Sequence, residues 1–305
     1  KVRNFMHEID GRKFDFCYIE YPSGPIFNKI DIDLIKNIHA ANIPIGLFYR
    51  DMYWLFPDWA WAGMNFLKKN LLIYMQKRDL KVIEKCCDIV YFPSEGAGKA
   101  VAAVSHLNKT GVLPPGCKHP EGQVKQKVND SVLYIGGLRE ADGVDLLFDA
   151  IEEINEKDGK ELHLDVIARE TEFKYLNDRS LLNKPYIQFN SASGEALEKY
   201  FARNDLGIIP RRHHFYMDLA IGVKSGDYIS HDLPVITTDG KATADYIRSE
   251  KCGIVCPATK DGIKSAILEA YKNDNLSRLR NETYMAAERN LWSRRVEKLI
   301  SDLVD

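Results

Sequence analysis

Short apolar runs alternate with helical patterns along most of this chain, and this alternation constrains the fold more than any other feature. In the second half the apolar runs predict six strands, at residues 132–135, 162–168, 186–189, 206–210, 235–237 and 253–256. Strands that alternate with helices form a parallel sheet covered on both faces. Ligands bind beyond the carboxyl ends of such strands. We therefore predict an α/β domain whose site lies in the loops that follow the strands.

The first half shows the same alternation less regularly. Strands are predicted at residues 14–20, 44–49 and 88–93, with helices at 31–41 and 65–87. A Pro-Pro-Gly run and the polar stretch after it predict a linker at 117–129. With 305 residues the chain has room for two Rossmann-like domains, which we expect at 1–116 and from 130 onward. Because the chain begins at Lys1 and soon enters a strand, we expect a leading segment to precede it.

Composition narrows the classes of function. A net charge of −2 argues against a nucleic-acid-binding protein, which needs an excess of basic residues. Six cysteines without a disulfide-like spacing favour a reducing cytoplasm. Cys252 and Cys256 have no second Cys or His pair at zinc-site spacing, so we interpret them as structural. No run reaches the roughly 18 apolar residues needed to span a bilayer.

The segment after the first strand of the second domain is rich in glycine. It contains Gly136, Gly137 and Arg139, and a helix is predicted to begin near Gly143. Glycines let backbone N–H groups approach a ligand, and the positive end of a helix favours a phosphate. Arg139 suits pairing with a diphosphate. Ordinary turn chemistry and a solvated arginine explain the same residues.

A second segment places several charged residues around one strand–helix–strand unit. Arg211 and Arg212 follow a predicted strand, while Lys224 and Asp227 lie at a predicted helix start. A lysine there can hold a phosphate, and a carboxylate one turn later can accept hydrogen bonds from ribose hydroxyls. Favourable charges near a helix end are the alternative.

The second half resembles the donor domain of the retaining GT-B glycosyltransferases, in particular family 4 and its relatives of the group 1 type. Three stretches carry the resemblance: the glycine segment with Gly-Val-Asp-Leu-Leu at 143–147, the strand Asp-Leu-Gly-Ile-Ile-Pro at 205–210, and Lys-Ser-Gly-Asp-Tyr at 224–228 followed by Pro-Val-Ile at 234–236. Residues 286–294 are similar to the closing helix of these enzymes. The resemblance implies a donor domain at 130–285 and a helix at 286–305 that crosses back to the first domain.

The resemblance also implies roles for single residues. Asp227 stands where a Glu usually binds the nucleotide ribose, with Tyr228 beside it. Lys224 would face the diphosphate, and Asn190, after a predicted strand, would lie near the base. Asp218 is one position away from the usual first Glu of a Glu-x₇-Glu pair and would hold the donor sugar.

Two positions depart from the family pattern. Gly137 and Asp142 stand where an Arg and a Lys are common. The missing positive charge would then come from Arg139, Arg211 or Arg212. We expect Arg139, Lys224 and Asp218 to be the catalytic residues. Positive groups stabilise the departing diphosphate, so no metal ion or other cofactor is expected.

An aromatic run follows the predicted strand at 44–49 and is our candidate for the acceptor side. It includes Arg50, Asp51, Tyr53 and Trp54. Such aromatics stack on a sugar or enter a lipid interface, but they also pack loops. Between Phe66 and Lys85 the sequence contains six basic residues and only two acidic ones. This excess of positive charge is compatible with peripheral contact at the inner face of a membrane. A solvated helix face explains the same pattern.

These observations together predict a two-domain GT-B glycosyltransferase with a small or incomplete first domain. It would move a hexose from a UDP- or GDP-sugar to a saccharide or lipid-linked acceptor, in polysaccharide or glycoconjugate assembly. A non-catalytic binding protein of the same fold is the main rival, because Gly137 and Asp142 are altered. A nucleotide-sugar epimerase is a second rival, for which we find no placed acid and base.

Overall fold

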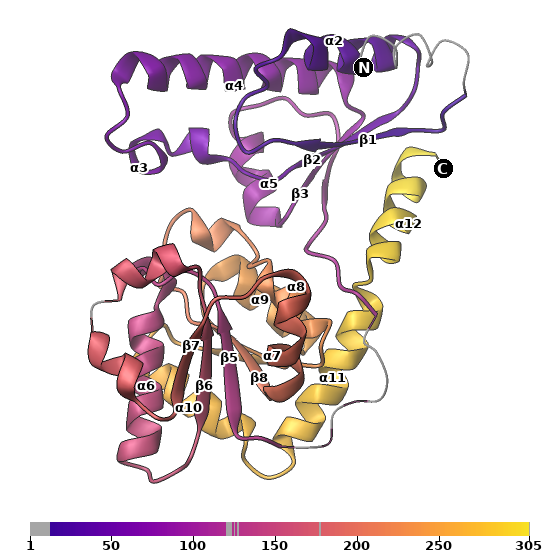
Figure 1. The fold of residues 1–305 in the computed structure, drawn as a ribbon. Coiled ribbons are helices and arrows are strands. Elements are labelled where there is room, and N and C mark those ends of the chain that lie inside the picture. Colours follow the sequence, from indigo (N-terminus) through magenta and orange to yellow (C-terminus); the bar gives the residue numbers. More distant parts are fainter. Residues whose placement is uncertain (1–12, 120–123, 125, 127, 177, 305) are drawn as a thin grey trace. The chain divides into compact units, whose positions relative to one another are not determined.

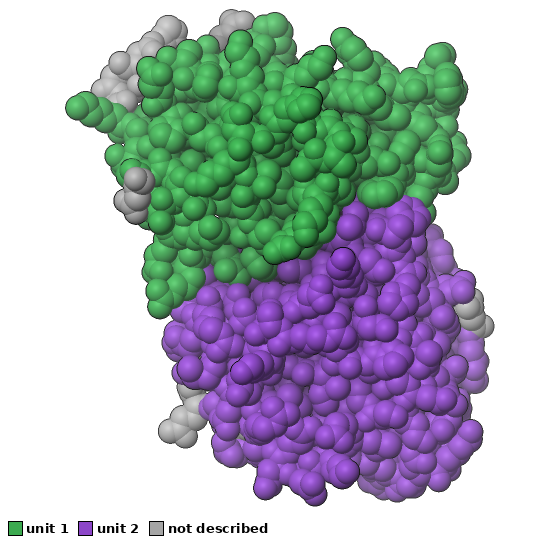
Figure 2. Space-filling model, turned by 180° about the vertical axis from the view of Figure 1, so that it is seen from behind, with its two compact units in different colours: residues 1–114, 293–305 green, residues 115–292 purple. Residues whose placement is uncertain are grey.

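The computed structural model describes residues 13–119, 124, 126, 128–176 and 178–304. The chain forms two compact units (Figure 2). Unit 1 comprises Lys1–Pro114 and Ser293–Asp305, and unit 2 comprises Pro115–Trp292. Part of the linker expected at 117–129 lies outside the described residues.

Unit 1 is built on a parallel sheet in the order β1-β2-β3-β4. Its strands are β1 (Cys17–Tyr21), β2 (Ile45–Tyr49), β3 (Ile89–Phe92) and β4 (Thr110–Val112). Helices α2 (Lys29–Ala40) and α4 (Phe66–Cys86) lie together on one side of this sheet, and α5 (Glu95–Ala102) lies on the other (Figure 1). A short helix, α3 (Pro57–Ala60), precedes α4. Strand β4 was not predicted.

The last helix, α12 (Trp292–Leu303), supplies part of the core of unit 1. Leu299 is buried with Ile89 and Tyr91 of the sheet. The Tyr91 hydroxyl donates to Asp302 Oδ2 at 2.9 Å, which fixes the end of the helix. Residues far apart in the sequence thus close one core.

Unit 2 is built on a parallel sheet of six strands in the order β10-β9-β8-β5-β6-β7. All six predicted strands of this half are present, and no bound differs from its prediction by more than one residue. They are β5 (Ser131–Ile135), β6 (His163–Ile167), β7 (Ile187–Asn190), β8 (Leu206–Ile209), β9 (Val235–Thr238) and β10 (Gly253–Cys256).

Helices cover both faces of this second sheet (Figure 1). One face packs against α6 (Val144–Glu156) and α10 (Lys260–Ala270). The other packs against α7 (Glu198–Arg203), α8 (Lys224–Ile229) and α9 (Lys241–Glu250). Helix α11 (Asn275–Arg289) contributes to both cores. The two-sided cover confirms the predicted α/β architecture.

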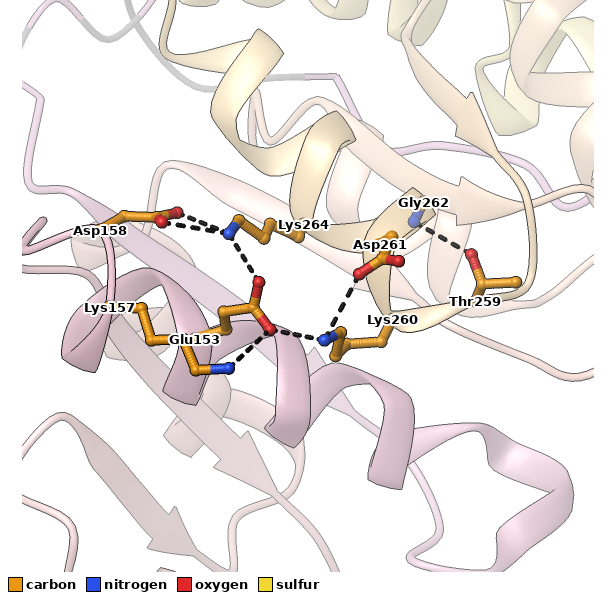
Figure 3. A network of polar contacts seen from close by, with 8 residues as sticks. All are labelled: Glu153, Lys157, Asp158, Thr259, Lys260, Asp261, Gly262 and Lys264. Carbon is orange, nitrogen blue, oxygen red and sulfur yellow. Dashed lines mark hydrogen bonds and ion pairs between the residues drawn. The ribbon is translucent and has the colours of Figure 1, made fainter.

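A charged cluster joins α6 to α10 at the surface of unit 2 (Figure 3). The Glu153 carboxylate lies 2.5 Å from Lys260 Nζ and 2.8 Å from Lys264 Nζ. These lysines hold the pKa of Glu153 down, to about 2. The cluster links two helices that are more than 100 residues apart in the sequence.

The closing helix expected at 286–305 is interrupted. Helix α11 ends at Arg289 and α12 begins at Trp292. Between them Leu291 forms a parallel bridge with Cys117. The Cys117 N–H donates to the Asn290 carbonyl at 2.7 Å, and the Trp292 N–H donates to the Cys117 carbonyl at 3.1 Å. Both chain segments that connect the units are therefore joined in unit 2.

Among the residues with described positions, no helix is long and apolar enough to cross a membrane.

Candidate functional site: the carboxyl edge of the second sheet

The chain reverses its direction across the second sheet at one point. It runs outward from β5 through β6 to β7 and then places β8 on the other side of β5. Ligands bind at such a switch point, beyond the carboxyl ends of the strands. Gly136 and Gly137 follow β5, and Pro210 and Arg211 follow β8. Three predicted donor-site residues, Gly136, Gly137 and Arg211, thus follow the two strands that flank this point.

Packing requires glycines in the turn between β5 and α6. A Cβ atom on Gly136 would lie 2.4 Å from the Tyr134 hydroxyl oxygen, and this hydroxyl donates to the Gly137 carbonyl at 2.5 Å. Gly143 has φ +70°, and a Cβ atom there would lie 1.8 Å from the Pro210 carbonyl oxygen. Only glycine fits such a left-handed, close approach. The turn is therefore pressed against the end of β8.

Two carboxylates line this turn. A Cβ atom on Gly137 would lie 2.5 Å from Asp142 Oδ2 and 3.2 Å from Glu172 Oε2. Asp142 accepts a hydrogen bond from the Arg139 N–H at 3.2 Å, and Glu172 accepts one from the Leu138 N–H at 3.3 Å. Burial is the main cause that raises the pKa of Asp142. Backbone donors that suit a phosphate are thus bonded to the chain's own carboxylates. No pattern in the sequence indicated Glu172.

The three candidate arginines have different surroundings. Arg139 remains accessible, with its Nε 3.8 Å from Glu172 and its guanidinium 4.8 Å from the centre of the Tyr175 ring. Arg211 lies beside the glycine turn, since a Cβ atom on Gly143 would be 3.4 Å from its carbonyl carbon. Its positive charge lowers the pKa of Asp142 against the effect of burial. Arg212 instead forms an ion pair with Asp145 in the first turn of α6. Of the two consecutive arginines, Arg211 is therefore the better candidate for a ligand.

Lys224 and Asp227 lie together on the first turn of α8. Lys224 Nζ is 2.8 Å from Asp227 Oδ2, and both side chains are about two-fifths exposed. The sequence predicted that Lys224 binds the diphosphate of a donor and that Asp227 binds its ribose. In the structure each neutralises the other, and both remain accessible to a ligand.

Tyr228, which we placed beside Asp227 among the residues that bind the donor, is buried in the structure. Its side chain is fully buried, and its hydroxyl accepts a hydrogen bond from the Ile135 N–H at 3.0 Å. A Cβ atom on Gly207 would lie 2.3 Å from the ring, so strand β8 passes directly against it. Burial raises the pKa of this phenol. Tyr228 therefore holds the ends of β5 and β8 and has no surface with which to touch a donor.

Asp218 belongs to a group that the sequence did not reveal. The His213 ring has Nδ1 3.5 Å from Asp218 Oδ2 and Nε2 2.9 Å from Asp239 Oδ1. Gly240 lies beside the group, since a Cβ atom there would be 3.0 Å from Asp218 Oδ1. These residues follow β8 and β9, at the same edge of the sheet as the glycine turn.

Asn190 ends β7, and its carbonyl accepts the Ala168 N–H at 3.0 Å.

The acceptor candidates lie at the carboxyl edge of the first sheet. Asp51 accepts a hydrogen bond from the Ser23 hydroxyl at 2.5 Å and lies 3.5 Å from Arg50 Nε. The Arg50 side chain is about half exposed. The rings of Tyr53 and Trp59 are 6.2 Å apart. Segments after β1 and β2 thus bring Ser23, Arg50 and Asp51 together.

Trp54, the fourth acceptor candidate, is buried and belongs to a polar network under this edge. Its indole N–H donates to the Tyr49 hydroxyl at 2.7 Å. The Tyr21 hydroxyl lies 2.8 Å from Gln76 Oε1 and 2.9 Å from Asp79 Oδ2. With the Gln76 amide turned over, its nitrogen would lie within donating distance of both tyrosine hydroxyls. Only 5% of Trp54 is exposed, so its predicted contact with an acceptor stays a prediction.

Comparison with known proteins agrees with this geometry. Residues 129–273 match the family described as Glycosyl transferases group 1. No curated protein matches the sequence. Among solved structures, the sucrose-phosphate synthase of Thermosynechococcus elongatus has a TM-score of 0.66 at 14% identity, covering 99% of this chain and 77% of that one.

Two further solved structures are similar. The pneumococcal O-GlcNAc transferase GtfA, in complex with UDP and GlcNAc, has a TM-score of 0.67 at 15% identity, and covers 99% of this chain and 59% of that one. A UDP-forming α,α-trehalose-phosphate synthase from Burkholderia vietnamiensis has a TM-score of 0.62 at 11% identity, covering 99% and 74%. The present chain thus spans between about three-fifths and three-quarters of the length of these structures.

Two parallel α/β units, with a glycine turn at the switch point of the second, define a protein of the GT-B fold. Unit 2 is a group 1 glycosyl transferase domain. Residues 129–273 thus form a glycosyl transferase domain, as the resemblance of the second half implied.

Proposed function

We propose that the chain transfers a hexose from a UDP- or GDP-sugar to a saccharide or lipid-linked acceptor, with retention at the anomeric carbon, in polysaccharide or glycoconjugate assembly. The observation that carries the proposal is the accessible Lys224–Asp227 pair on α8, 2.8 Å apart, in the same unit as the glycine turn at the switch point. One similar structure holds UDP and another belongs to a UDP-forming enzyme, which favours UDP.

A donor would exchange the internal pair for better partners. Lys224 would bind the diphosphate and Asp227 would accept hydrogen bonds from ribose hydroxyls, each a charge-assisted bond. Asn190, after β7, would lie near the base. Asp218 and His213 follow β8, and the Asp218 carboxylate would accept hydrogen bonds from hydroxyls of the donor sugar.

The leaving diphosphate develops charge as the glycosidic bond breaks, and Lys224, Arg139 and Arg211 would stabilise it. These cations make a metal ion or other cofactor unnecessary in the proposal. Asp142 opposes the binding of a diphosphate, but the burial that raises its pKa also lowers the cost of protonating it. Arg50 and Asp51 are the proposed acceptor contacts, and Tyr53 would add an aromatic face for a sugar ring. We expect the protein in the cytoplasm, with peripheral contact at the inner face of the membrane.

Calorimetric titration with UDP and GDP tests the donor site. Lys224→Ala and Asp227→Ala should each weaken binding of the preferred nucleotide by about tenfold or more, because each removes a charge-assisted hydrogen bond. Lys199→Ala, which removes an exposed charge elsewhere in unit 2, is the control and should bind normally.

Incubation with nucleotide sugars then separates the alternatives. Transfer or slow hydrolysis, with an anomeric configuration read by NMR, would support the enzyme and report on retention. Tight nucleotide binding without any turnover would favour the non-catalytic binding protein, whose case rests on the two carboxylates beside Gly137. Wild-type protein that binds neither UDP nor GDP would contradict the proposed donor site.

A further inference from the structure

Helix α4 has two faces of different character. Its inward face is buried in unit 1 and carries Gln76, Asp79, Leu80, Ile83 and Cys86. At 100° per residue these positions cluster on one side, and the opposite side faces away from the unit. The helix has 21 residues, and Figure 1 shows its first turns extending past the sheet beside α3. Within the described part of unit 1, the outward face is therefore long and exposed to solvent.

The first half of the outward face is apolar. Phe66 is 74% exposed, Leu67 75%, Leu71 56% and Tyr74 68%. Their spacing places all four on the side opposite the buried residues. Single exposed apolar residues are common on proteins, but four large ones on one helical face mark an interaction surface. A merely solvated face does not account for them.

The second half of the same face is basic. Lys77, Lys81 and Lys85 follow at intervals of four residues and are all exposed. Within the part of the chain that the structure describes, these three lysines have no ion-pair partner. Like charges at this spacing repel one another along a helix. A partner that carries negative charge would remove this repulsion.

We propose that the outward face of α4 docks on an anionic lipid bilayer. The aromatic and aliphatic side chains of its first half would enter the boundary between headgroups and acyl chains, where such residues gain most from leaving water. The lysines of its second half would lie at the level of the lipid phosphates. A second copy of the chain fits less well, because face-to-face pairing would bring lysines of both copies near one another. This inference rests on the membrane contact of the proposed function and assigns it to one helix face, but it does not depend on the donor.

Co-sedimentation of the full chain with phosphatidylcholine vesicles, with and without phosphatidylglycerol, tests the proposal in the absence of nucleotide sugars. We expect binding to the anionic vesicles alone, weakened by added salt. The triple substitution Lys77→Gln, Lys81→Gln, Lys85→Gln should lower the partition coefficient about 100-fold, from about fivefold per lysine. Phe66→Ser with Leu71→Ser should lower it at least about tenfold.

A matched control removes three exposed basic residues of unit 2, by Lys199→Gln, Lys272→Gln and Arg278→Gln, and should bind vesicles like the wild type. All substituted side chains are exposed, so thermal melting should stay unchanged. Absence of vesicle binding, equal binding to neutral vesicles, or equal loss in the control would overturn the proposal. A second copy would be the partner instead if the protein did not bind vesicles, formed a dimer in sedimentation velocity, and lost that dimer in the Phe66→Ser, Leu71→Ser variant. That result would also overturn the proposal. UDP binding, measured separately, reports on the donor site whichever result is obtained.

Discussion

Gly143→Ala tests whether the turn between β5 and α6 is as tightly placed as the structure indicates. The new methyl group would stand 1.8 Å from the Pro210 carbonyl oxygen, far inside van der Waals contact. The residue would also keep a φ of +70°. Gly159 offers a matched control, because its φ is +66° and nothing lies within 4 Å of a Cβ atom there. The two substitutions share the backbone strain and differ in the clash.

The expected magnitudes follow from these two contributions. A left-handed conformation costs an alanine about 1–2 kcal/mol, offset by about 0.4–1 kcal/mol because alanine restricts the unfolded chain. Overpacking adds about 1–3 kcal/mol. Gly143→Ala should therefore destabilise unit 2 by about 2–4 kcal/mol and Gly159→Ala by about 0.5–1 kcal/mol.

Differential scanning calorimetry of the full chain measures the difference. A domain of this size loses about 2–4 °C in Tm per kcal/mol, so the transition of unit 2 should fall by about 4–16 °C for Gly143→Ala and by about 1–4 °C for Gly159→Ala. UDP binding should weaken only in the first variant, because its displaced turn lies at the switch point. Equal Tm values for the two variants would refute the close approach of the turn to Pro210.

Three further predictions concern charged residues. Arg280→Ala should destabilise unit 2 by about 3–5 kcal/mol in calorimetry, because it leaves the Asp205 carboxylate buried without its partner at 2.6 Å; a loss below 1 kcal/mol, as for an exposed pair, would contradict this. Glu153 has its pKa lowered from 4.5 to about 2, so it contributes stability above pH 4.5 that is lost as the pH falls towards 2. Thermal melts of Glu153→Gln should accordingly decline less than the wild type across this window, and parallel curves would argue against the cluster. Glu172→Gln should tighten UDP binding roughly fivefold in calorimetry, because it removes about 1 kcal/mol of repulsion of the diphosphate; unchanged or weaker binding would place the diphosphate elsewhere.

The alternation of apolar and helical patterns was sufficient to predict the second sheet. Its strands are buried on both faces, so their sequences are continuous apolar runs. Such runs are stable only in the interior of the domain. Strand β4 escaped prediction because it has three residues and an exposed Thr110. The break between α11 and α12 escaped it because the cause lies at Cys117, more than 170 residues earlier. Local pattern carries no information about such a partner.

The candidate site was predicted in its positions more than in its contacts. Residues that follow strands must meet at one edge of a parallel sheet, and Gly136, Gly137 and Arg211 do so. Aromatic residues are harder to interpret, since a Tyr or Trp serves a core and a ligand equally well. Tyr228 and Trp54 are examples, because we placed both among the ligand-binding residues and both are buried. Glu172 reaches the glycine turn from a short 3₁₀ helix, Glu170–Tyr175, which is too short for its sequence to show a clear periodicity.

The path of the chain also bears on the order in which the protein can fold during synthesis. Unit 2 is one continuous stretch, complete once residue 292 has left the ribosome. Unit 1 begins first but lacks Leu299 and the anchor of Tyr91 on Asp302 until the last helix emerges. Domains fold as units as they are made. The first unit to begin is thus the last to finish, and a nascent chain stalled after residue 292 would carry a folded unit 2 beside a unit 1 whose core still lacks Leu299.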